Sequence, residues 1–105
     1  MTSDDFAKAI KDSVNNLYQL YTEKADNTTA VGYDLDQLEL SAQQIKIVHK
    51  ILKEVMIETT HCIFSGIEGE TMLGSDIKKY TIYDDLGNQV SGGLPNNILK
   101  KFGVL

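Results

Sequence analysis

The sequence contains no arginine and no tryptophan, and it has a single cysteine and a single proline. Because Cys62 is the only cysteine, no disulfide can form within the chain, whereas small secreted domains usually depend on several. Arginine is the side chain that proteins use most to contact phosphates and guanine edges. Its absence, together with a formal net charge of −5, argues against nucleic-acid binding.

Long apolar runs are also missing, and none approaches the roughly 20 residues that a transmembrane helix requires. The first residues include Asp4 and Asp5, where a secretory signal would carry positive charge. We therefore predict a cytoplasmic protein that does not associate with membranes. A length of 105 residues fits one hydrophobic core, so we expect residues 1–105 to form a single domain.

The N-terminal segment has the apolar spacing of an amphipathic helix, which we predict from Ser3 to about Lys24. Thr2 followed by Asp5 has the pattern of a capping box, in which each residue satisfies a backbone N–H group of the other. The residues on the predicted apolar face are Phe6, Ile10, Val14, Leu17 and Tyr21.

A second, longer helix is predicted from Ser41, with Gln44 completing a capping box, to about Phe64, with Gly66 as its stop. A competing interpretation makes residues 59–67 a strand, because threonine, isoleucine and phenylalanine favour strands. The face that we expect to be the most buried set in the fold consists of Ile45, Val48, Leu52, Val55 and Met56.

Residues 25–40 are predicted to connect these helices, with a break at 26–29 and then either one helical turn capped by Asp34 or an extended stretch. Further along, residues 79–83 and 89–91 favour strands and flank a turn at 84–88. A last helix begins at Pro95 and is closed by Gly103. The predicted fold is therefore α+β and helix-dominated: two long helices and a short C-terminal helix packed with a small β-hairpin.

The residues that could carry chemistry do not form a recognisable motif. Neighbours in a helix point about 100° apart, so His61 and Cys62 would not face each other, and Cys62 is interpreted as a small apolar residue of the stripe. Glu68 and Glu70 flank Gly69 with no nearby histidine, lysine or arginine to complete an acid–base site. We predict no enzymatic activity, no cofactor and no metal site.

The negative charge is unevenly placed, because residues 1–40 carry the whole net charge of −5 and the remainder is neutral. An acidic surface suits a basic protein partner, since complementary potentials raise association rates. We predict a small acidic protein-binding module, in its narrowest form a bacterial immunity- or antitoxin-type inhibitor that neutralises a basic toxin or nuclease by stoichiometric binding. The candidate contact residues are Tyr33, Asp34, Asp36, Glu39, Tyr80, Tyr83, Asp84 and Asp85.

Two alternatives belong to other functional classes. One is a small ligand-binding or enzymatic domain that uses Glu68, Glu70 and His61 around the glycine-rich loop. The other is a structural subunit that forms a homodimer through the broad apolar stripe of the second long helix.

Overall fold

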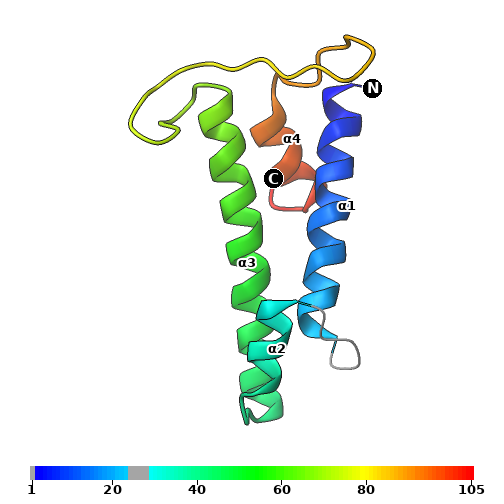
Figure 1. The fold of residues 1–105 in the computed structure, drawn as a ribbon, viewed down its shortest axis with the longest axis vertical. Coiled ribbons are helices and arrows are strands. Elements are labelled where there is room, and N and C mark those ends of the chain that lie inside the picture. The colour runs from blue at the N-terminus through cyan, green and yellow to red at the C-terminus, as the bar shows by residue number, and fades with distance from the viewer. Residues whose placement is uncertain (1, 24–28) are drawn as a thin grey trace.

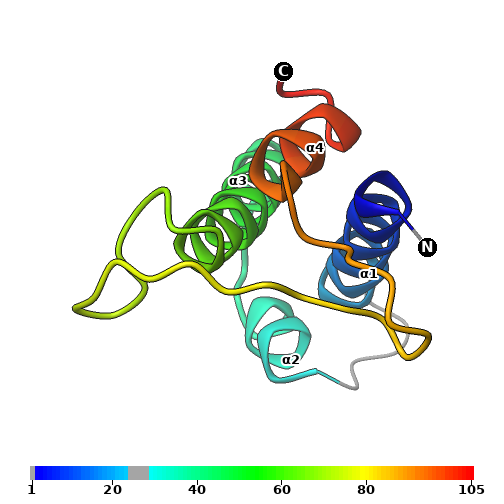
Figure 2. The same cartoon turned by 90° about the horizontal axis from the view of Figure 1, so that it is seen from above.

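The computed structural model describes residues 2–23 and 29–105, and that part of the chain folds into four helices without a strand. The two long helices, α1 (Ser3–Thr22) and α3 (Ala42–Ile67), run antiparallel along the long axis of the molecule (Figure 1). Seen from above, the short helices α4 (Leu94–Lys101) and α2 (Ala30–Asp36) lie on opposite sides of this pair (Figure 2). The segment between α3 and α4 crosses the end of the pair at which α1 begins (Figure 1).

Both long helices begin as the sequence predicts. In α1 the Thr2 hydroxyl accepts from the Asp5 amide at 3.1 Å, and the Asp5 carboxylate accepts from the Thr2 amide at 3.0 Å. In α3, Ser41 and Gln44 make the same reciprocal pair, at 3.2 and 2.9 Å. These two capping boxes satisfy N–H groups that a helix start otherwise leaves open.

Other helix boundaries differ in detail from the prediction. α3 runs unbroken to Ile67, so the strand interpretation of residues 59–67 is wrong and the helix continues one residue past Gly66. α2 is capped not by Asp34 but by Thr29, whose hydroxyl accepts from the Gly32 amide at 3.0 Å. The predicted helix end at Lys24 and most of the predicted break at 26–29 lie outside the described residues.

The predicted β-hairpin is wrong, and with it the α+β fold class. Between α3 and α4 the described chain makes isolated antiparallel bridges, such as Tyr83 with Gln89 and Glu68 with Lys79, and no ladder. A two-stranded hairpin has marginal stability on its own. Here the segment is held by isolated hydrogen bonds in place of a ladder. The Ile82 amide donates to the Ser91 hydroxyl at 3.0 Å, and the Ile82 carbonyl accepts from the Val90 amide at 2.9 Å.

The hydrophobic core lies around α4. Leu94 and Ile98 are fully buried against Ala7 of α1, and Phe6 and Phe64 pack at the edge of this cluster. The prediction that one face of α3 forms the most buried set is also wrong. None of the five residues of that face is fully buried, and Val55 is 50% exposed. The reason is that α4 packs against both α1 and α3, near the end at which α1 begins (Figure 1), whereas α2 on the opposite side packs, among the described helices, against α1 alone.

Polar contacts hold α4 in place at its N-terminus. Its N-cap, Gly93, has no side chain with which to accept a hydrogen bond. The Glu68 carboxylate takes that role from the end of α3, accepting from the amides of Gly92, Gly93 and Leu94 at 2.9, 2.8 and 3.0 Å. Three otherwise open donors are thereby satisfied by one negative charge at a helix N-terminus.

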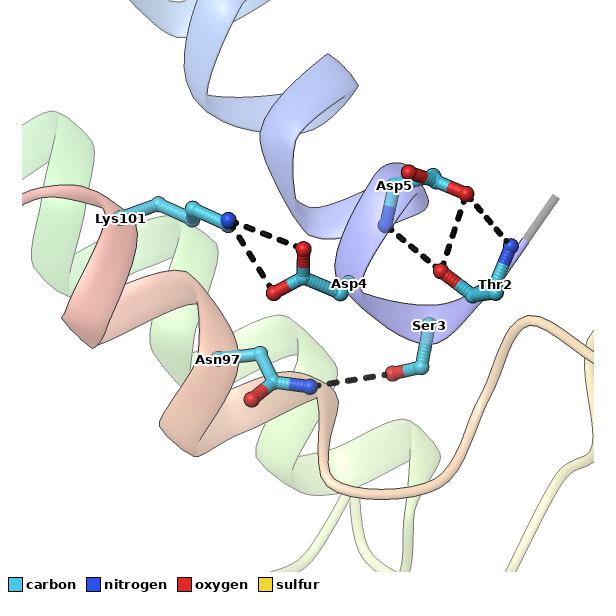
Figure 3. A network of polar contacts seen from close by, with 6 residues as sticks. All are labelled: Thr2, Ser3, Asp4, Asp5, Asn97 and Lys101. Carbon is cyan, nitrogen blue, oxygen red and sulfur yellow. Dashed lines mark hydrogen bonds and ion pairs between the residues drawn. The ribbon is translucent and has the colours of Figure 1, made fainter.

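A second set of contacts ties α4 to the start of α1 (Figure 3). Lys101 forms an ion pair with Asp4 at 3.1 Å, and the Asn97 amide donates to the Ser3 hydroxyl at 3.3 Å. The Ser3 hydroxyl in turn donates to the Gly92 carbonyl at 2.8 Å. Segments more than 85 residues apart are joined in this way, so the two ends of the chain are fastened together.

The molecule is more extended than its length requires. Its radius of gyration is 16.1 Å, against about 13 Å for a compact domain of roughly 100 residues. Its accessible surface is 7011 Å², whereas a compact monomer of 11.7 kDa exposes about 5,900 Å². The chain therefore exposes more surface than a compact monomer of its mass, and large apolar side chains such as Ile51 and Val55 are among the exposed residues.

Candidate protein-binding groove between α1 and α3

An apolar groove runs between α1 and α3 on the side that faces away from α4. It consists of two hollows of about 420 and 350 Å³ that share Val14, Thr59 and Thr60. We call this feature the α1–α3 groove. Its lining residues are Phe6, Ala9, Ile10, Ser13, Val14, Leu17 and Tyr21 of α1, Val31 of α2, and Leu52, Val55, Met56, Thr59, Thr60, Ile63 and Phe64 of α3.

The lining of the groove contains no carboxylate, ammonium or imidazole group. Large aliphatic side chains on its walls are open to solvent, with exposed fractions of 50% for Val55, 45% for Ile63 and 38% for Leu17. Ile51, one turn before Val55 on the outer wall of α3, is 54% exposed. A contiguous apolar surface of this kind is typical of an interaction site rather than of a free monomer surface.

Both ends of the groove are bounded by packed side chains. At one end the rings of Phe6 and Phe64 meet edge to face, with centroids 6.1 Å apart. At the other end Val31 of α2 closes the hollow that begins at Val14. The groove is therefore open along its length and limited at its ends.

Lys53 occupies the opposite side of α3, where α1, α3 and α4 meet. Its ammonium group is hydrogen-bonded to the Asn15 side chain and lies 4.5 Å from the centroid of the Tyr18 ring. Burial lowers the pKa of Lys53, because a low-dielectric surrounding disfavours the charged form. A cation–π contact and a hydrogen bond compensate for the desolvation of this amine, so we interpret Lys53 as a structural bridge between helices.

The contact residues predicted from the sequence fall into two separate groups. Tyr33, Asp34, Asp36 and Glu39 are exposed on α2 and the turn that follows it. The second group lies on the segment between α3 and α4, which crosses the opposite end of the long axis (Figure 1). The members of that second group are Tyr80, Tyr83, Asp84 and Asp85. The structure does not bring the two groups together into one surface.

Asp84, in the second group, organises a turn. Its carboxylate accepts hydrogen bonds from the amides of Leu86 and Asn88 at 2.9 and 2.8 Å, and from the Asn88 side chain at 3.1 Å. The hydrogen bonds from Asn88 lower the pKa of Asp84, since they stabilise the ionised form. These hydrogen bonds within the turn explain the role of the Asp84 carboxylate.

The three residues of the alternative enzymatic reading are placed in different surroundings. The Glu68 carboxylate holds the start of α4, and Glu70 is exposed. His61 Nε2 lies 3.4 Å from the Ser65 hydroxyl and borders a separate hollow of about 240 Å³. Within residues 2–23 and 29–105, no hydrogen bond or ion pair joins two of these three side chains, and no group of three or more histidine, cysteine, aspartate or glutamate residues could hold a metal ion.

Sequence reasoning missed the groove itself. Cys62, expected to be covered within the apolar stripe, is exposed. A signal was present in the sequence, because Ile47, Ile51 and Val55 continue the apolar surface of α3 beyond the single stripe that one neighbouring helix can cover. Helix periodicity shows which residues share a face, and it does not show whether anything in the same chain covers that face.

Among the described residues, no helix combines the length and the apolarity needed to cross a membrane. The chain matches no protein-family model, no curated protein and no solved structure. The candidate site therefore rests on the geometry of the α1–α3 groove.

Proposed function

We propose that this protein is a binding module for another protein and that the α1–α3 groove is its docking surface. The observation that carries the proposal is the continuous, uncharged apolar lining of the groove, in which Val55 is half exposed. Covering such a surface releases water from apolar side chains and favours association. No chemistry by the module is required, so the activity is stoichiometric binding.

The size of the uncovered surface fits this role. The accessible surface of 7011 Å² exceeds that of a compact monomer of the same mass by about 1,100 Å². A standard protein–protein interface covers about 800 Å² on each partner. The excess belongs to the whole molecule, including the exposed segment between α3 and α4, and it is large enough to contain one such interface.

The narrower hypothesis of a cytoplasmic, bacterial immunity- or antitoxin-type inhibitor stays a prediction within this proposal. It is supported by the net charge of −5 and the single cysteine. Both suit a cytosolic partner for a basic protein. Homodimerisation is the second candidate role for the same surface. The mass of a crosslinked complex distinguishes a homodimer from a complex with another protein.

Site-specific photocrosslinking in the native host tests the proposal. A benzophenone amino acid replaces Ile51 beside the groove in one variant and Ile77, which is 66% exposed between α3 and α4, in the matched control. We expect a single adduct of defined mass from the Ile51 variant and none from the Ile77 variant. An adduct of twice the chain mass would show self-association, and the absence of any adduct at Ile51 would overturn the proposal.

A further inference from the structure

On the basis of this proposed function, we infer that the occupant of the α1–α3 groove is one amphipathic helix of a partner protein. That helix is about three to four turns long and carries basic residues on both sides of its apolar stripe. The inference depends on three features of the groove: its length, the charge along its edges, and the elements that stand at its ends.

The length of the groove sets the length of the occupant. Along α1 the lining extends from Phe6 to Tyr21, and along α3 from Leu52 to Phe64. At 1.5 Å per residue these stretches span about 18 to 23 Å, the length of a helix of about 12 to 15 residues. Two helical walls and a charge-free floor are the features of a helix-in-groove site, which binds apolar anchors spaced at i, i+3, i+4 and i+7.

The edges of the groove are acidic on both sides. On α1, exposed Asp5 and Asp12 lie four residues before and three residues after Ala9, so they share one edge of the helix. On α3, exposed Glu58 lies three residues beyond Val55, and Glu54 lies one turn before Glu58. Both glutamates line the hollow beside His61, so they lie just beyond Val55 on the outer side of α3.

Two lysines offset part of this charge. Lys8 forms an ion pair with Asp12 at 3.0 Å, and Lys50 forms one with Glu54 at 3.7 Å. Asp5 and Glu58 remain in excess, so the edges carry net negative charge around an uncharged floor. Basic residues that flank the apolar stripe of a bound helix would lie opposite these acids, which favours association and correct register.

The same features disfavour a second copy of this chain. Pairing two such faces would bring acidic edges together, and like charges across an interface oppose association. In addition, α2 and the segment before α4 lie on that side of the α1–α3 pair (Figure 2). They stand where the α1–α3 pair of a second copy would have to lie flat, whereas a single helix needs less of that face.

Three synthetic peptides test the inference on the full chain. The first is a helix of about 14 residues with a leucine stripe flanked by lysines. The second replaces every lysine by glutamate, and the third keeps the composition of the first but scatters the leucines around the helix. In fluorescence anisotropy titrations we expect the first peptide to bind at a 1:1 ratio, about tenfold or more tightly than the second, and the third not to saturate.

A pair of protein variants shows where the peptide binds. Val55→Gln with Ile63→Gln changes the groove, and Ile77→Gln with Leu86→Gln changes exposed aliphatic residues elsewhere. Neither pair alters the net charge, so attraction between a basic peptide and an acidic protein is the same in both. We expect about a tenfold loss of affinity or more in the groove variant and none in the control, with circular dichroism confirming that both variants fold. Labelling of exposed Cys62, next to Ile63, should slow when the first peptide is bound.

The outcomes separate this inference from the proposed function. Equal affinity for the lysine and glutamate peptides, or unchanged binding by the groove variant, would overturn the inference. So would failure of all three peptides to bind while the Ile51 crosslinker still captures a partner, and in that case the proposed function would stand. A dimer that dissociates on Val55→Gln substitution would assign the groove to a second copy.

Discussion

The two sides of the α1–α3 pair differ in how far other parts of the chain cover them. On one side α4 inserts Leu94 and Ile98, and the Glu68 carboxylate and the Asp4–Lys101 ion pair fix the ends of that helix. On the other side the short helix α2 covers one end, and the rest is the open α1–α3 groove. The comparison indicates that the α4 side supplies the packed core of the fold, while the groove side stays open to solvent and, in our proposal, receives a partner.

Truncation of one aliphatic residue on each side should give the largest contrast. Ile98→Ala removes a fully buried side chain, and we expect a loss of about 2–5 kcal/mol in the free energy of unfolding. Val55→Ala removes a side chain that is already half in water, so the loss should stay below about 1 kcal/mol. Urea denaturation measures both, and equal losses would mean that the two sides are packed alike.

Removal of the Glu68 carboxylate should have the next largest effect. In Glu68→Ala, the amides of Gly92, Gly93 and Leu94 lose their acceptor, which should cost about 1–3 kcal/mol. The neighbouring exposed Glu70→Ala is the control. We expect faster amide hydrogen exchange at residues 92–94 in the first variant only. Unchanged exchange there would show that α4 does not depend on this cap.

Charge removal should sharpen the contrast between the groove and α2. One triple variant changes Asp12→Asn, Glu54→Gln and Glu58→Gln at the groove edges. The other changes Asp34→Asn, Asp36→Asn and Glu39→Gln on and after α2, which the sequence predicts as contacts. Because charges act over about 8 Å at physiological salt, the edge variant should slow association of the lysine peptide by about threefold and the α2 variant less. Stopped-flow rates across a salt series decide this, and the reverse order would favour the contacts predicted from the sequence.

Acid titration should produce the smallest effect. Hydrogen bonds with the backbone and then the side chain of Thr2 lower the pKa of Asp5 from its usual 3.8. The unfolded chain therefore binds this proton at a higher pH than the folded one, and the stabilisation is complete above 3.8 and lost as pH falls through the folded pKa. The Asp5→Asn variant should lose stability less steeply over that range. Parallel acid unfolding curves for the two proteins would contradict this role.

Local signals account for the part of the fold that could be predicted from the sequence. The capping boxes at Thr2 and Ser41 are short patterns that depend on neighbouring residues, and both are present. Pro95 is the second residue of α4, one position after the start of a helix that the sequence predicts to begin at Pro95, and Gly103 has the positive φ of 75° expected after its end. Such features can be read from sequence because their partners lie within one turn.

The features that sequence did not reveal depend on distant partners. Residues 79–83 have strand propensity, but a strand also needs a continuous ladder of backbone hydrogen bonds. Here Ile82 is hydrogen-bonded to Val90 and Ser91, and no ladder continues from it. The Glu68 cap joins residues 24–26 positions apart. At the candidate site, the sequence identifies the apolar faces of α1 and α3. It does not show that these faces are exposed, because the open side of the pair is known only once α4 has been placed.

The bridge between Glu68 and Lys79 has a consequence for how the chain tolerates change in length. Residues 70–78 leave the end of α3 and return to the same point, where the Tyr80 amide donates to the Ile67 carbonyl at 2.7 Å. The entropy of closing such a loop grows slowly, by about 0.6 kcal/mol for each doubling of its length. This stretch is exposed apart from half-buried Leu73. An inserted reporter domain at Gly74, where an added Cβ would meet nothing within 4 Å, should therefore leave both the α4 packing and the α1–α3 groove undisturbed.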